Sequence, residues 1–293
     1  MEVTSIFAQQ IWNGLIIGMA YVLFSLSLNL ITGVLGVINM AQGELYMLGA
    51  IVFWALSMLL KINIFIGMGM SAIIVGVFGF LLYIVAIKPM QTKDPLSVLL
   101  STVAVSNILI FGTAIILGSD TKSIETPFKG TFKLFGALIT YSNIIMFSIG
   151  IAAIVGIFLL LRTNWGKAVR ATAQDRIGAS IVGINTELMY ASTVAIAAGY
   201  AALGGGIMSS IVVVYPSMGE SLLIKGFAVM VISGMGKLKE CIIVGFVLGI
   251  MESLFGQYIS SQYREVFVFG LLVLVCLLRP QGIFSGVKKN ATH

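Results

Sequence analysis

The feature that most constrains this chain is a series of apolar runs, most of them long enough to cross a membrane. A helix needs about 20 apolar residues to span the hydrocarbon core of a bilayer. Lipid offers the backbone no hydrogen-bond partners, so runs of this length are predicted to be helices, and the lack of strict alternation argues against a β-barrel. The runs cover roughly residues 10–32, 45–60, 64–87, 97–117, 143–161, 189–214, 221–236, 241–260 and 266–278.

Composition supports an integral membrane protein. Of the 293 residues, 59% are hydrophobic and only 10% are charged, whereas an average soluble domain has about 25% charged residues. A soluble chain of this size could not hide so much apolar surface, which excludes a soluble enzyme. We therefore expect one all-α transmembrane bundle over residues 1–293, with about eight or nine spans, because the 221–236 and 266–278 runs are short for a full crossing.

The charges predict how the chain is oriented in the membrane. It has 17 Lys and Arg against 11 Asp and Glu, and the basic residues lie mainly in short loops. Such loops face the cytoplasm, so the positive balance indicates topology rather than nucleic-acid binding. Four basic segments share the cytoplasmic face by this rule: 88–93, 162–176, 237–239 and the C-terminal tail from 279. The N-terminus and the 118–142 loop then lie outside, the loop with a small hairpin expected around Pro127 and Gly130.

The sequence contains no pattern for chemistry of its own. Cys241 and Cys276 lie at or within apolar runs and His293 is the last residue, so neither a disulfide nor a metal site is expected. The first residues lack the basic region of a cleaved signal peptide, so the first run is expected to stay in the mature protein. The sequence has no P-loop for binding nucleotide, and without H-E-x-x-H or G-x-S-x-G motifs a zinc or serine intramembrane hydrolase has no support, so we expect no enzyme activity and no cofactor.

Residues 32–44 join two apolar runs with almost no soluble loop between them. Three glycines permit non-helical backbone, which at membrane depth is tolerated only when it is buried in protein or lines a cavity. Asn39, Gln42 and Glu44 add polar groups to this segment. The segment is either a broken or re-entrant helix beside a solute pathway, with these three residues as candidates, or an ordinary cytoplasmic turn with Asn39 or Glu44 in solvent.

Two glycine-containing patterns concern helix packing and repetition. Residues 31–36, Ile-Thr-Gly-Val-Leu-Gly, resemble residues 232–236, Ile-Ser-Gly-Met-Gly, and both close an apolar run on the same predicted face. Transporters often carry internal repeats with interrupted helices, although so short a match also arises by chance. Residues 199–206, Gly-Tyr-Ala-Ala-Leu-Gly-Gly-Gly, favour close helix packing, and their last three glycines suggest a helix break as the alternative.

The longest segment outside the spans on the cytoplasmic face covers residues 162–188. Ala171, Asp175, Ala179 and Gly183 recur every four residues, so a helix here would have one face of small residues with a single acid. A small face lets a partner protein approach closely, which indicates a docking helix. The alternative is a solvated helix with an ordinary positive-inside charge run.

Glu252 lies well inside the 241–260 run, where an ionisable side chain is costly and is a functional hypothesis by default. Lys225, in the neighbouring run, is its candidate partner. Glu252 is therefore either a pathway residue or half of an ion pair that packs two helices.

Taken in order, these residues resemble the membrane-spanning permeases of branched-chain amino acid ABC importers, the LivH type more than the LivM type. The resemblance covers nearly the whole chain. Its strongest pieces are residues 14–18, 36–50, 165–184, 225–227 and 278–284. Gln42 stands where many relatives have His, so the resemblance carries over no proton-transfer role.

The resemblance implies a multi-pass permease of the bacterial cell membrane that translocates leucine, isoleucine and valine. It implies three partners besides membrane lipid: cytoplasmic ATPase subunits, a second permease that is the same or a different chain, and an extracytoplasmic solute-binding protein. The 162–188 segment would be the coupling loop that docks into an ATPase cleft, with Arg170, Asp175, Ala179 and Gly183 as its candidate contacts. Urea or short amides are an alternative substrate class, and a self-sufficient secondary transporter or a structural membrane subunit is an alternative function.

Overall fold

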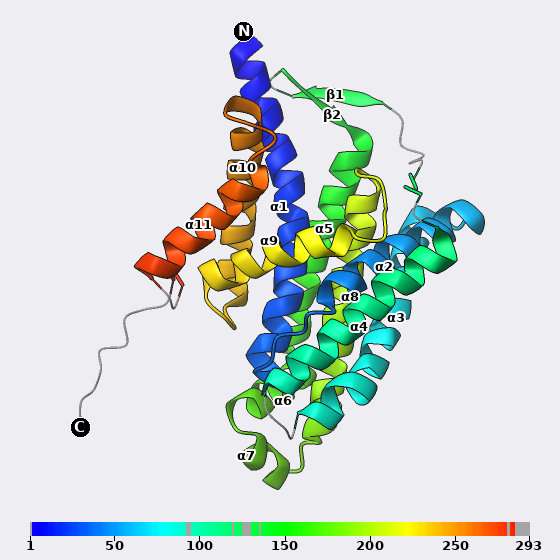
Figure 1. Cartoon of the computed structure of the whole chain (residues 1–293), viewed down its shortest axis with the longest axis vertical. Helices are drawn as coiled ribbons and strands as arrows, with labels where there is room; N and C mark the ends of the chain where they lie inside the picture. The colour runs from blue at the N-terminus through cyan, green and yellow to red at the C-terminus, as the bar shows by residue number, and fades with distance from the viewer. Residues whose placement is uncertain are drawn as a thin grey trace.

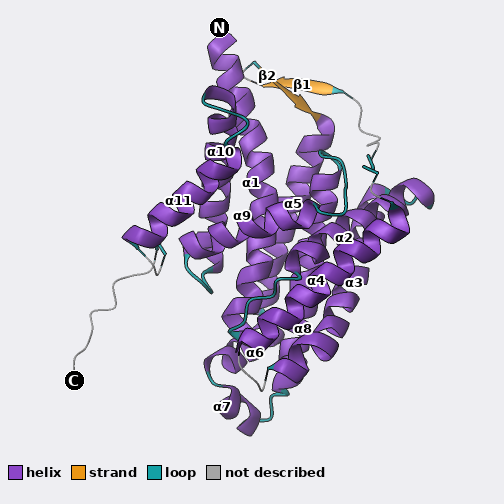
Figure 2. Cartoon of the chain, in the orientation of Figure 1, coloured by secondary structure: helices purple, strands orange, loops and turns teal. Residues whose placement is uncertain are grey.

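The computed structural model describes residues 2–91, 95–118, 120–124, 130–134, 136–279 and 282–284, and there the chain is a helical bundle with one small sheet (Figure 1; Figure 2). The helices are α1 (Glu2–Leu35), α2 (Gln42–Trp54), α3 (Ile64–Leu82), α4 (Pro95–Leu117), α5 (Tyr141–Arg162), α6 (Asn164–Gln174), α7 (Arg176–Ile181), α8 (Thr186–Ser209), α9 (Met218–Ser233), α10 (Leu238–Tyr258) and α11 (Arg264–Leu278). The strands are β1 (Thr131–Leu134) and β2 (Ala137–Thr140). Short π-helical and 3-10 segments, Ala55–Leu59, Tyr83–Ile87 and Lys88–Met90, extend α2 and α3.

Six helical segments of the described chain are long and apolar enough to cross a membrane. They are Ser5–Leu35, Gln42–Leu59, Ile64–Met90, Leu96–Leu117, Tyr141–Arg162 and Thr186–Ser209. Helices α9 and α11, with 16 and 15 residues, fall short of the length of a full crossing. Figure 1 shows α9 lying across α1 rather than along it. The all-α class is confirmed, whereas the described residues contain six candidate spans where eight or nine were expected.

Helix α1 is the centre of the bundle and packs against α10, α8 and α9. Its contact with α10 depends on glycine: a β-carbon added at Gly14 would lie 2.5 Å from the Ile250 Cα, and one at Gly249 would lie 2.5 Å from the Gly18 Cα. Neither position can hold a side chain unless the helices separate. Between apolar helices in lipid, such close backbone packing supplies much of the association energy, because no hydrophobic effect drives the helices together.

Helix α8 packs against α2 and α3 through small residues in the same way. Gly205 lies so close to the carbonyl oxygen of Tyr46 that a β-carbon would overlap it, and Gly49 similarly meets the backbone of Ala202. The packing role predicted for residues 199–206 is confirmed. The suggested break is wrong, because α8 continues through all three glycines to Ser209.

The helices differ strongly in how much of their surface the bundle covers. The spanning part of α1 is 89% buried, whereas that of α4 is 11% and that of α5 22% buried. Helices α4 and α5 therefore form the outer surface of this chain, where lipid or another subunit would cover them.

The sheet is an antiparallel hairpin in the loop predicted to lie outside, at the same end as the start of α1 (Figure 2). Leu134 pairs with Ala137 beside the turn, which falls later in the sequence than the turn expected around Pro127 and Gly130. Gly136 accounts for this position, since its φ of 85° suits a tight turn. Residues 125–129, which include Pro127, lie outside the described residues.

Candidate functional site

The chain leaves the helix between α1 and α2, in the glycine-containing segment that the sequence singled out. Gly36 has φ +69° directly after α1, and its N–H donates to the Thr32 carbonyl at 3.1 Å. Asn39, Gln42 and Glu44 are each 0% exposed. An ordinary turn with Asn39 or Glu44 in solvent is therefore wrong: Asn39 and residues 41–44 are buried within the protein, while Gly36 at the start of the break is exposed.

Gln42 joins three helices at this break. Its Nε2 donates to the Ser27 hydroxyl of α1 at 3.0 Å and to the Ala197 carbonyl of α8 at 3.1 Å. Its Oε1 accepts from Asn39 Nδ2 at 3.1 Å, and Asn39 Oδ1 accepts from the Ala41 N–H at 3.1 Å. Because both N–H groups and the oxygen of Gln42 are bonded within the protein, Asn39 and Gln42 hold the shape of the break.

Glu44 differs from these neighbours because half of its carboxylate has no partner. Oε1 accepts from the Ser106 hydroxyl of α4 at 3.3 Å, whereas Oε2 is buried and makes no hydrogen bond among the described residues. None of the three ion pairs within the described chain includes Glu44. A buried charge without a counter-ion is costly, so a cationic group arriving from outside would be stabilised here.

The N-terminus of α9 meets the N-terminus of α2 beside Glu44. A β-carbon at Gly43 would lie 2.7 Å from the Gly219 carbonyl oxygen, so the two backbones touch. Each helix has an acid in its first turn, Glu44 in α2 and Glu220 in α9, and the two carboxylates interact electrostatically. The N-termini of two helices, each with an acid in its first turn, thus meet at one junction.

Glu220 was not among the candidates from the sequence, although a signal for it existed. Gly219 and Glu220 begin α9 with the same Gly-Glu pair, Gly43 and Glu44, that lies at the start of α2. The glycine allows each helix to approach the other and the acid follows in the first turn. A search for this repeated pair would have connected the two segments.

Glu252 is held in an ion pair inside the bundle. Its Oε1 accepts from Lys225 Nζ at 2.8 Å, and its Oε2 accepts from the Tyr21 hydroxyl at 2.5 Å. The side chains of Lys225 and Glu252 are 17% and 4% exposed. The predicted pairing is confirmed and joins α9, α10 and α1, which favours the packing interpretation. A pathway role for Glu252 stays a prediction.

Helices α6 and α7 project together from one end of the bundle (Figure 1). The single helix expected here is wrong, because the chain breaks at Asp175, which has φ −151° and caps α7 by accepting the Ile177 N–H at 2.9 Å. The four small and acidic positions therefore do not share one helix face: Ala171 lies in α6, Ala179 is buried in α7, and Gly183 follows α7 with φ +86°.

The surface that this helical hairpin exposes is apolar instead. Ile177, Ile181 and Val182 are 73%, 79% and 75% exposed, and we call these three residues the α7 tip. Arg170 is exposed on α6, with its Nη1 donating to the Leu161 carbonyl at 2.5 Å. Large apolar side chains exposed together on a polar segment are typical of a protein contact. The sequence reasoning missed the α7 tip because it assumed an unbroken helix.

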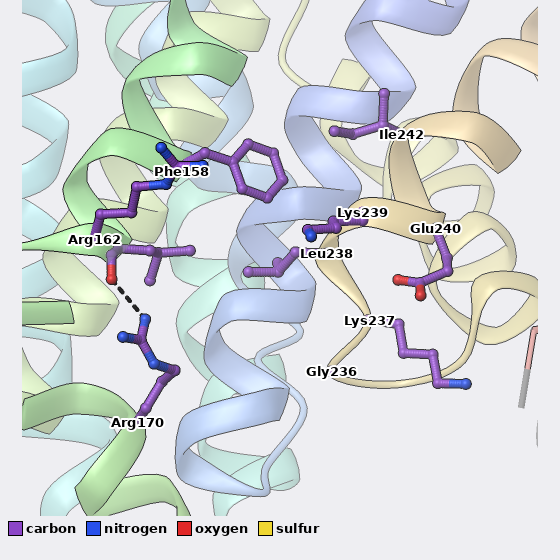
Figure 3. A pocket seen from close by; sticks show the side chains of 10 residues that line it. Phe158, Arg162, Arg170, Gly236, Lys237, Leu238, Lys239, Glu240 and Ile242 are labelled. Atoms are coloured by element: carbon purple, nitrogen blue, oxygen red, sulfur yellow. Dashed lines mark hydrogen bonds between the residues drawn. The ribbon is translucent and has the colours of Figure 1, made fainter. Parts of the chain in front are cut away.

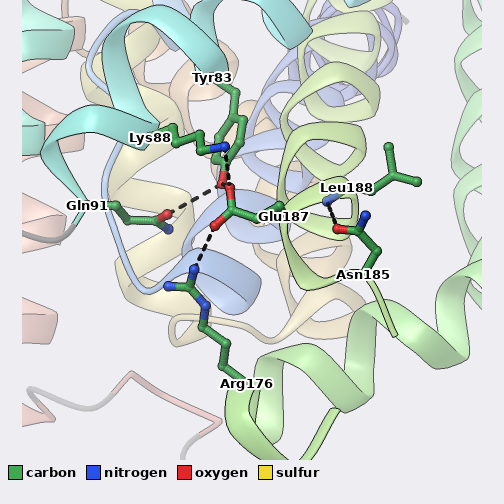
Figure 4. Close-up of polar contacts among 7 residues, drawn as sticks. All are labelled: Tyr83, Lys88, Gln91, Arg176, Asn185, Glu187 and Leu188. Carbon is green, nitrogen blue, oxygen red and sulfur yellow. Dashed lines mark hydrogen bonds and ion pairs between the residues drawn. The ribbon is translucent and has the colours of Figure 1, made fainter. Parts of the chain in front are cut away.

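Glu187, in the first turn of α8, joins this hairpin to the end of the α3 segment (Figure 4). Its carboxylate accepts from Arg176 Nη2 at 2.7 Å, from Lys88 Nζ at 3.2 Å and from the Tyr83 hydroxyl at 3.3 Å. The three charged groups are partly exposed, so their ion pairs contribute little to stability, whereas Tyr83 is buried. One carboxylate thus connects α7, α8 and the end of a spanning segment, and no sequence pattern pointed to it.

The chain matches one family model and three known proteins over most of its length. A family model described as "Branched-chain amino acid transport system / permease component" matches residues 10–276. The chain is 31% identical to the high-affinity branched-chain amino acid transport system permease protein LivH of Escherichia coli (strain K12), over 95% of the chain and 96% of that protein. It is also 31% identical to BraD of Pseudomonas aeruginosa, over 95% of the chain and 96% of BraD. Its identity to LivM of Escherichia coli (strain K12) is 23%, over 90% of the chain and 68% of LivM.

Proposed function

The chain belongs to the branched-chain amino acid transport system permease family, and we propose that it is the membrane-spanning permease subunit of an ATP-driven importer for leucine, isoleucine and valine. The observation that carries this proposal is the 31% identity to LivH over 95% of the chain. The protein lies in the cell membrane and moves its solute without chemical change. ATP hydrolysis belongs to separate cytoplasmic subunits, and an extracytoplasmic binding protein delivers the solute.

The charge distribution supports an orientation in which α6 and α7 face the cytoplasm. All four basic residues between 162 and 176 are exposed at this end of the bundle, while the β1–β2 hairpin lies at the opposite end with the start of α1 (Figure 1). Positive residues are retained on the cytoplasmic side during membrane insertion. The hairpin and the N-terminus then lie outside, and the C-terminus lies inside.

In this orientation the 162–188 segment is the coupling element. The α7 tip would enter a cleft of the ATPase subunit, with Arg170 and Asp175 at its border and Ala179 and Gly183 fixing the fold of the hairpin. Glu187 would pass the movement of α7 to α3 and α8, because it contacts residues of all these segments. Closure of two ATPase subunits would thereby shift the spanning helices between two states.

The junction of α2 and α9 is the part of the pathway that the geometry supports best. Branched-chain amino acids are zwitterions with an apolar side chain. The unpartnered oxygen of Glu44 would accept the substrate ammonium, and the adjoining helix N-termini would face its carboxylate. Asn39 and Gln42 would keep this junction in shape, and Glu252 would hold α9 in place through Lys225.

Uptake of labelled leucine into cells that lack other branched-chain importers tests the function. We expect uptake with the complete importer, competition by isoleucine and valine but not by urea, and loss of uptake when the partner ATPase is inactivated. Uptake that persists with the inactive ATPase would instead indicate a secondary transporter. The variant Glu44→Gln is expected to lower uptake more than tenfold with normal membrane insertion, and unchanged uptake would remove Glu44 from the pathway.

A further inference from the structure

A pocket of about 670 Å³ opens between the α5–α6 corner and the turn that joins α9 to α10 (Figure 3). Arg162 and Arg170 lie on one side of it, and Lys237 and Lys239 lie on the other. Glu240 is the one acidic residue among those that line it. Four basic side chains against one acid give the pocket a strongly positive potential.

No ion pair among the described residues neutralises the positive charges around the pocket. None of these four basic residues takes part in an ion pair within the described chain. Lys237 Nζ donates to the Phe284 carbonyl at 2.6 Å and Arg170 Nη1 to the Leu161 carbonyl at 2.5 Å, and these neutral acceptors leave the charges uncompensated. Like charges around one hollow repel each other, so an anion bound between them would be stabilised.

The remaining lining of the pocket is apolar. Phe158 and Leu161 of α5 and Leu238 and Ile242 of α10 face it. The spanning part of α5 is only 22% buried, so this apolar side continues onto a surface that lipid would cover. A soluble anion would use only the basic half of such a pocket, whereas a phospholipid would use both halves.

We propose that this pocket binds an anionic phospholipid of the cytoplasmic leaflet. Its phosphate group would lie among Arg162, Arg170 and Lys239, and an acyl chain would follow Phe158 and Ile242. Basic pockets between spanning helices on the cytoplasmic side recognise anionic head groups in this way. The inference rests on the membrane orientation of the proposed function, but not on the transported solute.

The pocket lies where a bound lipid would affect coupling. One wall is formed by the end of α5 and by α6, which leads into the α7 tip. The other wall is formed by the start of α10, the helix that contains Glu252. A lipid that contacts both walls would tie the coupling hairpin to the helices that hold α9. The transport rate would then depend on the anionic lipid content of the membrane.

Native mass spectrometry of the importer purified from its membrane tests the site, with dioleoylphosphatidylglycerol and the zwitterionic dioleoylphosphatidylethanolamine as probes. The test variant is Arg162→Gln with Lys239→Gln. The control is Lys133→Gln with Lys167→Gln, which removes the same charge from exposed positions outside the pocket. We expect phosphatidylglycerol adducts to fall about tenfold in the test variant and to stay unchanged in the control.

Three results would overturn the proposal. Equal loss of adducts in the test and control variants would mean that only net charge matters. Displacement of phosphatidylglycerol by glycerol phosphate would mean that the pocket binds a soluble phosphate. Adducts on the separate permease that vanish in the assembled importer would mean that a partner protein fills the pocket. Melting temperatures of both variants within about 2 °C of the parent would exclude misfolding as the cause.

Discussion

The α2–α9 junction and the α6–α7 hairpin are both irregular, yet they are built on opposite principles. The junction is buried, its backbones touch at Gly43 and Gly219, and both polar atoms of the Gln42 side chain are hydrogen-bonded within the protein. The hairpin is exposed, presents Ile177 and Ile181 to its surroundings, and is tied to α8 by the partly exposed ion pair of Arg176 with Glu187. Changes at the junction should therefore alter stability and transport together, whereas changes at the hairpin should alter coupling alone.

The largest effect is expected from breaking the buried ion pair that holds α9 at the junction. Lys225→Met leaves Glu252 charged and buried without its partner, which should lower the free energy of unfolding by about 3–5 kcal/mol. Lys225→Met combined with Glu252→Met should regain most of this loss, because no charge remains buried. Thermal unfolding in detergent measures both variants, and a single variant as stable as the parent would show that the pair contributes nothing.

The next effect is expected from forcing the two helix N-termini apart. A side chain at Gly219 would overlap the Gly43 carbonyl, so Gly219→Val should lower the free energy of unfolding by about 1–3 kcal/mol and abolish leucine uptake. Gly112→Val is the matched control, because nothing lies within 4 Å of a β-carbon there. If both variants unfold at the same temperature, the two backbones are not in contact.

A smaller change in stability, with a large change in assembly, is expected at the hairpin. Ile177→Ser with Ile181→Ser removes two exposed apolar side chains and should weaken binding of the ATPase subunit about tenfold or more. The melting temperature should stay unchanged. Leu60→Ser is the control, since Leu60 is 65% exposed in the α2–α3 connection. Undiminished recovery of the ATPase with the double variant would remove the α7 tip from the interface.

The smallest effect on stability is expected at Glu187. Its charged partners, Lys88 and Arg176, are partly exposed, so Glu187→Gln should change the free energy of unfolding by less than about 1 kcal/mol. Transport per ATP hydrolysed should fall nonetheless, because α7 and α3 lose their shared carboxylate. Measuring uptake and ATP hydrolysis in the same vesicles separates the two quantities, and an unchanged ratio would leave Glu187 with a purely structural role.

The comparison between the buried junction and the exposed α6–α7 hairpin also shows how much of the fold and of the site could be predicted from the sequence alone. The spanning helices were predictable, because lipid imposes an apolar composition that no other environment requires. The run of basic residues located the segment that forms the α6–α7 hairpin. The pairing of Lys225 with Glu252 followed because an isolated charge at that depth is too costly. The break at 36–41 was foreseen from glycines and polar residues, although only burial distinguished it from a solvated turn.

Other features depend on contacts that periodicity does not encode. Asp is favoured at a helix cap over a helix interior, so Asp175 was compatible with a break, but the four-residue spacing of small residues hid it and the structure shows that Asp175 ends α6 and begins α7. The meeting of Gly43 with Gly219 joins residues far apart in the chain, and the Gly-Glu pair that begins both helices is a weak signal that periodicity does not detect. The hairpin turn at Gly136 was misplaced because Pro127 and Gly130 gave an equally valid turn signal.

The most direct test of the central claim is to isolate the tagged chain from its native membrane in mild detergent and to identify by mass spectrometry what accompanies it. An ATP-driven importer predicts a P-loop ATPase together with a second permease, either a different hydrophobic chain or an untagged copy of this one. It also predicts that Ile177→Ser with Ile181→Ser loses the ATPase and keeps the second permease. Recovery of the chain without any ATPase would contradict the account.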